Sequence, residues 1–556
     1  MRNVSSQAGA SSRRLAALLI CTFMGSVAAM GQSDSRSQNP AAQVQPSQGE
    51  GEVSSTDANI LRELEAMRQR IQELEAQLRA QGAASDTASH LQAARNNLLS
   101  AGITQGSQAS EAAVPVAAVV PPAAVLGAGA AAPSEKAAPF AFADFTWLNG
   151  NPRIEQPPVD SKFFTPEIRA DVDYTYDFRH PQDDTIGGSS EVFRASEVQL
   201  TQLGVGGDFH YDQVRARFMT QFGMYSTTTP RNDSSYTRGN WDLADAYRYL
   251  SEAYGGYHFD ALHGINVDAG IFMSYVGLFS YYNFDNWAYQ PSYVSSNTPW
   301  FFTGVRTQIF LTDKLKIEPW FVNGWQSYGR YNDRPGVGGQ ILWRPTGRLS
   351  ILGNQYALGE DTLGNPGRVR YHTDDSVQYK YYSNPLGRRL SQAAFSLTGD
   401  AGCEHGGGVS CAGDSSKGPK QSFLGYMIYN RLWFDRNLFG LTIGGGAINN
   451  PGRYLVLLPP INGATASSGT PYFTENPGEK FKAWDSSATV DYMPSQYFTW
   501  RLEYNHRVAD VPYFTGPGGI TPPGGNQGAP GSLVPGWSPD LVRSENRVTG
   551  AILVMF

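Results

Sequence analysis

The sequence predicts an all-β chain that folds as a transmembrane antiparallel β-barrel of about sixteen strands. The first observation is an alternation of apolar and polar residues over a dozen positions. Soluble strands usually run about 5–6 residues, whereas strands that cross a membrane need about 9–11. The second observation is that about sixteen such segments follow one another from Glu167 to Phe556. The third is that short and long connections alternate between them, as in outer-membrane barrels.

The clearest alternation is in PEIRADVDYTYDFR, residues 166–179, where apolar side chains from Ile168 to Phe178 share one face and charged ones the other. QVRARFMTQFGM, GINVDAGIFMSY and YFTWRLEYNHR repeat the pattern. LKIEPWFVNGW is a weaker candidate because Pro319 has no N–H to give to a strand ladder. The predicted strands begin near Ile168, Val198, Val214, Tyr247, Ile265, Phe301, Leu315, Gly339, Leu349, Val369, Leu390, Phe423, Leu438, Ala483, Tyr497 and Leu541.

The connections predict how the barrel is oriented. Joins after even-numbered strands are short, such as YDQ, TDK and RPTG, whereas most joins after odd-numbered strands are long, such as SYYNFDNWAYQPSYVSSNTPW. An even count places both barrel ends on the short-turn side, which faces the periplasm in such proteins. The chain ends VTGAILVMF, and we expect this strand to pair with the first, because a closed barrel has no free edge.

The region before the barrel is predicted to contain four segments. Residues 1–30, with Arg13 and Arg14 before an apolar stretch, indicate a secretory signal peptide too short to span a membrane. Residues 31–56 are polar and predicted to be disordered, and 82–143 form an Ala/Pro-rich linker to the barrel domain at 144–556. Residues 57–81 predict a periplasmic coiled coil that makes a homo-oligomer, with a trimer preferred and a lone amphipathic helix as the alternative. Its seam consists of Ile60, Leu64, Met67, Ile71, Leu74 and Leu78.

Composition and cysteines narrow the function classes. Lys and Arg number 43 against 50 Asp and Glu, so the chain lacks the basic excess of a nucleic-acid-binding protein. Beyond the signal peptide the cysteines are Cys403 and Cys411, and in an exported chain this pair predicts a disulfide. A metal site that recruits Glu404 and His405 is the less favoured alternative, because the glycine-rich surroundings offer nothing to orient the imidazole. The sequence contains no HExxH or G-x-S-x-G motif, so no metal ligand, catalytic residue or cofactor site is predicted.

The alternation also assigns charged side chains to the lumen. Cations slightly outnumber anions there, which predicts a weak anion preference or little preference, unless the charges pair across the wall. The long loop Gly277–Pro299 is expected to fold inward, where its aromatic rings could stack on sugars; an interface girdle or an oligomer contact is the alternative. The pore-lining candidates are Arg169, Asp171, Asp173, Arg215, Arg217, Arg248, Asp268, Asp285, Arg306, Arg370, Arg501 and Glu503.

Three stretches, YTYDFRHPQDD, NWDLADAYRYLSEAYGGYHFD and LFSYYNFDNWAYQPSY, resemble the OmpL-like β-barrel porins of Gram-negative bacteria. The resemblance implies a passive channel for small hydrophilic solutes and ions, embedded in outer-membrane lipid, with no catalytic residues and no cofactor. Val554 and Phe556 are similar to the C-terminal signal read by the barrel-assembly machinery, although Ala551 stands where that pattern has glycine. The alternatives are a structural tether acting through the coiled coil and an outer-membrane enzyme.

Overall fold

The computed structural model describes Gln69 and residues 138–186, 192–230, 233, 241–330, 333–359, 367–450, 481–519 and 540–556. The chain divides into two units, Met1–Gly127 and Ala128–Phe556. Every described residue except Gln69 belongs to the second unit. The predicted signal peptide, the 31–56 segment and the coiled-coil seam lie outside the described residues.

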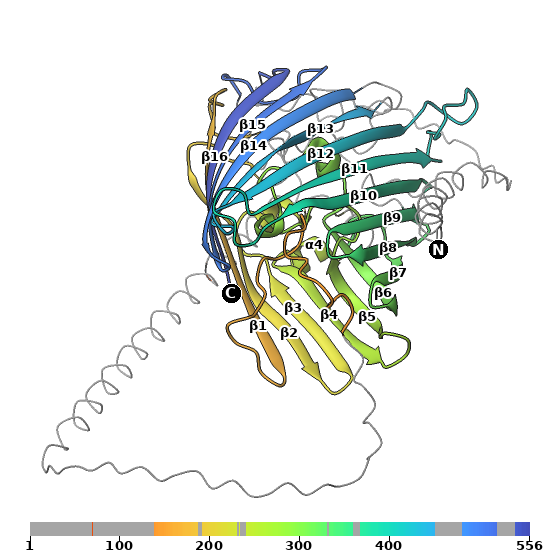
Figure 1. The fold of residues 1–556 in the computed structure, drawn as a ribbon. Coiled ribbons are helices and arrows are strands. Elements are labelled where there is room, and N and C mark those ends of the chain that lie inside the picture. The colour runs from red at the N-terminus through yellow and green to blue at the C-terminus, as the bar shows by residue number, and fades with distance from the viewer. Residues whose placement is uncertain are drawn as a thin grey trace, which may run out of the picture. The chain divides into compact units, whose positions relative to one another are not determined.

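Sixteen antiparallel strands close into a barrel in which each strand pairs with its neighbours in sequence (Figure 1). This confirms the predicted fold class and strand number. The strands are β1 (Phe164–Asp177), β2 (Val198–Tyr211), β3 (Val214–Thr220), β4 (Leu250–Phe259), β5 (Ile265–Met273), β6 (Phe301–Thr312), β7 (Leu315–Val322), β8 (Gly336–Thr346), β9 (Leu349–Gly359), β10 (Val369–Ser383), β11 (Gln392–His405), β12 (Ser422–Phe434), β13 (Phe439–Asn450), β14 (Phe481–Ser495), β15 (Phe498–Ala509) and β16 (Ser544–Met555).

Short helices lie in the connections between strands. They are α3 (Tyr225–Thr228), α4 (Leu243–Tyr247), η4 (Asn283–Asp285) and α5 (Tyr293–Ser296). None of the helices in the described part of the chain is long and apolar enough to cross a membrane.

The last strand closes the barrel, as the apolar C-terminus predicts. β16 pairs antiparallel with β1, with Val554 opposite Ala170. The Phe556 N–H donates to the Ile168 carbonyl oxygen at 2.9 Å, and the Phe556 ring stacks on Tyr497. The final residue is therefore held by β1 and by the turn that precedes β15.

The two rims of the barrel differ in the length of their connections. Residues 212–213 join β2 to β3, 313–314 join β6 to β7, and 496–497 join β14 to β15. On the other rim, 274–300 join β5 to β6 and 406–421 join β11 to β12. This confirms the predicted asymmetry, and we call the two rims the turn side and the loop side.

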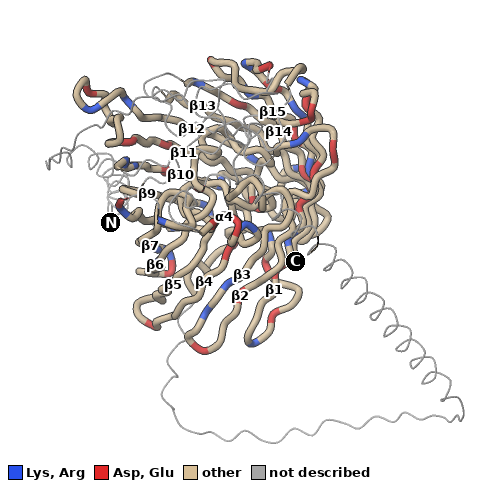
Figure 2. Tube along the Cα trace, turned by 180° about the vertical axis from the view of Figure 1, so that it is seen from behind, with Lys and Arg blue, Asp and Glu red and all other residues tan. Residues whose placement is uncertain are grey.

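The two faces of the wall have the polarity of a membrane barrel. Large apolar side chains point outward and are exposed, as for Leu424 at 64% and Ile443 at 58%. Polar side chains such as Thr489 and Asp491 point inward and are buried at 0% exposure. Charges of both signs are interspersed along the strands (Figure 2). An apolar outer wall with a polar inner face is the arrangement that lipid requires.

The weaker candidate strand at Leu315 is confirmed, and one local expectation needs correction. Pro319 lies within β7, where it pairs with Gly339 of β8, but the β6–β7 ladder has no partners at Glu318 and Pro319. The strand thus accommodates proline by losing pairing on one side only. The start of the fourth strand near Tyr247 was wrong, since α4 occupies 243–247 and β4 begins at Leu250. Arg248 therefore lies outside the strand and pairs with Asp245 at 3.2 Å.

Candidate functional site

The loop between β5 and β6, residues 274–300, lies inside the barrel. Its polar atoms bond to inward-facing side chains of β14, β15, β16 and β1, of which β14 stands directly opposite β6 in the closed order. Nearly every side chain from Tyr282 to Trp300 is buried. The inward fold expected for this loop is thereby confirmed, and we call residues 274–300 the inner loop.

Two carboxylates of the wall hold the tip of the inner loop. The Glu503 carboxylate accepts hydrogen bonds from the Tyr289 N–H at 2.6 Å and the Gln290 N–H at 2.9 Å. The Asp485 carboxylate accepts from the Ser292 hydroxyl at 2.7 Å and the Tyr293 N–H at 2.9 Å. Backbone N–H groups buried in a loop need acceptors, and the strands supply them.

The tyrosine at the tip reaches a third strand. The Tyr289 hydroxyl donates to Asp171 of β1 at 2.8 Å. Burial raises the pKa of Tyr289 well above that of an exposed tyrosine, with the nearby Asp171 charge acting in the same direction. The phenol therefore remains a hydrogen-bond donor across the physiological pH range.

Two arginines hold residues 283–286 of the inner loop, just before its tip. Arg501 donates to the carbonyl oxygens of Asn283 at 3.2 Å and Asn286 at 2.8 Å, while its Nε bonds Asp491 at 2.7 Å. Arg169 bonds Asp285 at 3.1 Å. Burial raises the pKa of Asp285, and the Arg169 guanidinium opposes that rise.

Most charged candidates on the wall are paired with neighbours. Asp268 bonds both Arg306 at 3.0 Å and Arg215 at 3.3 Å. Arg217 contacts Glu167 at 2.9 Å and Asp208 at 2.8 Å, as well as Glu252. Arg370 bonds Glu404 at 2.7 Å. Charge pairing across the wall, the alternative weighed from the sequence, therefore describes these residues.

The inner wall is covered unevenly. Along β14 and β15, buried inward side chains alternate with more exposed outward ones, and the inward Asn505 is only 3% exposed. On β6 and β8 most inward residues are half-buried instead. The tip of the inner loop lies against the first set of strands, and the loop's hydrogen bonds to β8 and β9 are made by Tyr275 near its start. The less crowded part of the lumen therefore runs along the second set.

The twelve sequence-predicted residues fall into four places. Asp285 lies in the inner loop and Arg248 in the β3–β4 connection. Arg215, Arg217 and Arg306 are partly exposed on β3 and β6. The remaining seven are buried on the strands: Arg169, Asp171, Asp173, Asp268, Arg370, Arg501 and Glu503.

Sequence reasoning missed Asp485 and Asp491 on β14 and the aromatic anchors Trp287 and Tyr289. The alternation in FKAWDSSATVDYM would have found the two aspartates. No local signal identifies which loop residue meets which strand, because those contacts join residues about two hundred positions apart.

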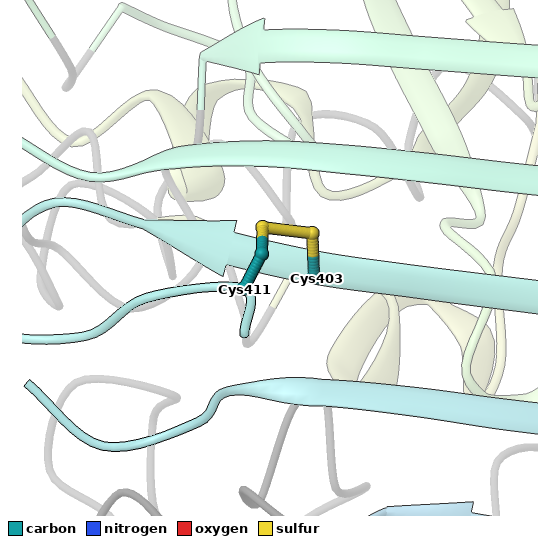
Figure 3. The surroundings of a disulfide bond; sticks show 2 residues. All are labelled: Cys403 and Cys411. Carbon is teal, nitrogen blue, oxygen red and sulfur yellow. A yellow bond between two sulfur atoms is a disulfide. The ribbon is translucent and has the colours of Figure 1, made fainter. Parts of the chain in front are cut away.

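The predicted disulfide is present. Cys403, at the end of β11, bonds Cys411 on the following connection, with the two Cα atoms 5.0 Å apart (Figure 3). The bridge ties the loop-side connection 406–421 to the strand that precedes it.

A closed sixteen-stranded barrel with an apolar outer wall, a polar inner wall and an inward loop defines an outer-membrane, porin-like protein. A model of the family described as "Putative beta-barrel porin-2, OmpL-like" matches residues 169–529. The chain belongs to this family of β-barrel porins. The search of curated proteins returned no match.

Solved structures with a similar fold are outer-membrane proteins. In-vitro folded OmpT of Vibrio cholerae, in a trimer form, is 10% identical with a TM-score of 0.39 over 71% of this chain and 100% of that one. The outer membrane channel DcaP of Acinetobacter baumannii is 11% identical with a TM-score of 0.39, covering 71% and 97%. An anion-selective porin from Comamonas acidovorans is 11% identical with a TM-score of 0.39, over 71% of this chain and 99% of that one. At these values the similarities carry no argument about solute or selectivity.

Proposed function

We propose that the protein is a passive, water-filled channel for small hydrophilic solutes and ions, with no enzymatic activity. The observation that carries this proposal is the polar inner wall of a sixteen-stranded barrel, a size that in porins encloses an aqueous lumen rather than a packed core. The inner loop narrows the lumen, and the water path runs along the half-buried side chains of β3 to β9.

The ion selectivity of this channel is proposed to be low. Fixed charges select ions when their fields reach the permeating ion. Here Arg306 and Arg215 share Asp268, and Arg217 has three carboxylate partners, so little net field remains on this wall. Of the twelve candidates, Arg215, Arg217 and Arg306 are the ones that we propose to line the water path, since their side chains remain partly exposed.

Sugar stacking gains no support from the inner loop. Trp287 is 3% exposed, and Tyr289 and Tyr293 are at most 1% exposed. These rings are packed against the wall and each other, so their faces are covered. We therefore propose that the channel passes small hydrophilic solutes in general and has no row of exposed aromatic rings for sugars.

The surroundings of the channel follow from the same proposal. The turn side faces the periplasm, where the preceding chain with its coiled coil would assemble a homo-oligomer, with a trimer expected. Val554 and Phe556 form the signal for the barrel-assembly machinery. The outer wall contacts outer-membrane lipid.

The test is conductance of the refolded full chain in planar bilayers, combined with thiol labelling of the proposed path. Gln308 of β6 is half-buried on the inner face, where it bonds Asn266. We expect a water-soluble thiol reagent to reduce the conductance of Gln308→Cys. The matched variant Asn505→Cys, on the covered side of the lumen, should react little. Folded protein that gives no conductance would refute the channel, and equal block of both variants would refute the path.

A further inference from the structure

A segment outside the sheet crosses the turn side of the barrel. Residues 138–156, which we call the strap, precede β1 and are drawn in orange with it in Figure 1. At its start, the Phe140 N–H donates to the Asp313 carbonyl oxygen in the β6–β7 turn at 2.7 Å. The Arg344 guanidinium near the end of β8 lies over the Phe140 ring at 5.0 Å and the Phe145 ring at 4.6 Å.

The middle of the strap is buried within the barrel. Trp147 and Leu148 are each 2% exposed. The Asn149 backbone N–H donates to the Gln378 side chain of β10 at 2.8 Å. The Asn149 side-chain oxygen accepts from the Trp287 backbone N–H at 2.7 Å. The Gly150 N–H donates to the Asp285 carbonyl oxygen at 2.9 Å. The strap is thus bonded to the wall on one side and to the inner loop on the other.

The far end of the strap reaches the opposite wall of the barrel at the same turn-side rim. Arg153 donates to the Thr499 hydroxyl at 2.6 Å and to the Ser495 and Phe498 carbonyl oxygens at 3.3 Å. The Tyr497 hydroxyl donates to the Gln156 carbonyl oxygen at 3.2 Å. β7 and β14 stand seven positions apart in the closed order of sixteen strands, so the strap runs close to a diameter of the barrel.

The strap and the inner loop form one apolar body. Phe145, Trp147 and Leu148 cluster with Leu278, Phe279 and Trp287 of the inner loop, and the same cluster includes wall residues of β11 to β14. The cluster therefore joins the strap both to the inner loop and to the wall. Its position, between the turn-side rim and the inner loop, is where it restricts passage.

We propose that the strap is an autoinhibitory segment that narrows the turn-side mouth when docked and widens it when displaced. This inference rests on the proposed channel function. Displacement is feasible because the strap adds no strand to the sheet, so its release breaks hydrogen bonds to the wall and the inner loop but leaves every ladder of the barrel intact. The apolar residues it uncovers favour its return.

The test compares strap variants of the full chain in planar bilayers. Trp147→Ala combined with Leu148→Ala removes the buried anchors. Gly150→Leu is a second release variant, because Gly150 has a φ of +78° and a Cβ there would collide with the Leu278 carbonyl oxygen. Val159→Ala is the matched control, since this residue lies just beyond the strap and is 58% exposed. Heat-modifiable gel mobility checks that each variant is folded.

A reversible lock completes the design. A Cβ added at Gly347 would lie 2.7 Å from the Ala143 Cβ, whereas the Cβ atoms of a disulfide lie about 3.5–4.5 Å apart, so a bridge forms once the strap and this turn separate by about 1 Å. The double variant Ala143→Cys and Gly347→Cys should hold the strap docked until it is reduced. Wild-type protein treated with the same reductant controls for opening of the Cys403–Cys411 bridge.

We expect the release variants to conduct at least about two-fold more than wild type, because they vacate part of a sixteen-stranded lumen. The oxidised lock should conduct least and recover on reduction, and Val159→Ala should match wild type. Equal conductance of the wild-type, released and locked proteins would overturn the strap inference while leaving the channel proposal standing. Absence of conductance in every folded protein would overturn the channel proposal, and the strap inference with it.

Discussion

Glu503 is the side chain whose loss should most directly free the inner loop. Its carboxylate accepts hydrogen bonds from the Tyr289 and Gln290 N–H groups and from the Thr489 hydroxyl at 2.7 Å. The perturbation is Glu503→Ala, which removes all three acceptor contacts at once and leaves the strand backbone in place.

The magnitude follows from the two backbone donors. A buried donor left without an acceptor costs about 1–3 kcal/mol, so two cost about 2–6 kcal/mol if the loop remains docked. Even the lower figure changes the ratio of docked to undocked loop by a factor of about 30. The Asp485 and Arg501 contacts oppose complete release, so we expect the tip from Tyr289 to Tyr293 to loosen first.

The assay is single-channel recording together with limited proteolysis of the folded protein. Glu503→Ala should show larger or noisier currents and new cleavage in the inner loop. Glu503→Gln, which keeps one acceptor oxygen, should be intermediate. Thr489→Val is the matched control, because it removes a donor to Glu503 and leaves both amide contacts. Currents and cleavage identical to wild type in Glu503→Ala would refute the view that this carboxylate anchors the loop.

Three further predictions test the wall, the bridge and the terminus. Leu502→Arg puts a charge on the outer wall of β15, where Leu502 is 56% exposed; it should cost about 2–4 kcal/mol near mid-membrane and lower the folded fraction in lipid, while Leu502→Ala should not. Replacing Cys403 and Cys411 by serine should cost about 2–3 kcal/mol by the loop-entropy model and leave conductance unchanged, as thermal unfolding and bilayer recording can check. Deleting Phe556 removes its stacking on Tyr497 and its bonds to Ile168, and should reduce the yield of heat-modifiable barrel; an unchanged yield would contradict this role.

The strands were predictable because their signal is local. In β1 the apolar and charged residues alternate without a break, and a period of two is visible in any dozen residues. Arg248 shows where that signal fails: RYLSEAYGG alternates loosely, and the Asp242 side chain caps a helical turn by accepting from the Asp245 N–H. A few capping contacts decide where such a helix ends and the strand begins, and the periodicity of the sequence does not reveal them.

The site was less predictable because its contacts are distant in sequence. The inward fold of the inner loop could be expected from its length and aromatic content, but its partners Asp485 and Glu503 could not. The strap was not anticipated at all. FAFADFTWLNG contains no alternation, and the bond between Asn149 and Gln378 spans 229 positions. Register around a closed barrel determines such pairs, and register is set by the whole sheet.

The inner wall assigns its charges to two different tasks. On β3 to β6, carboxylates and guanidinium groups pair with one another and leave the lumen nearly neutral. On β14 and β15, Asp485 and Glu503 accept hydrogen bonds from backbone N–H groups of the inner loop, and Arg501 donates to its carbonyl oxygens. If the barrel conducts as proposed, a count of its lumen charges therefore overstates their effect on permeating ions. Because the second set is committed to holding the loop, neutralising Glu503 should change the size of the current more than its ion preference.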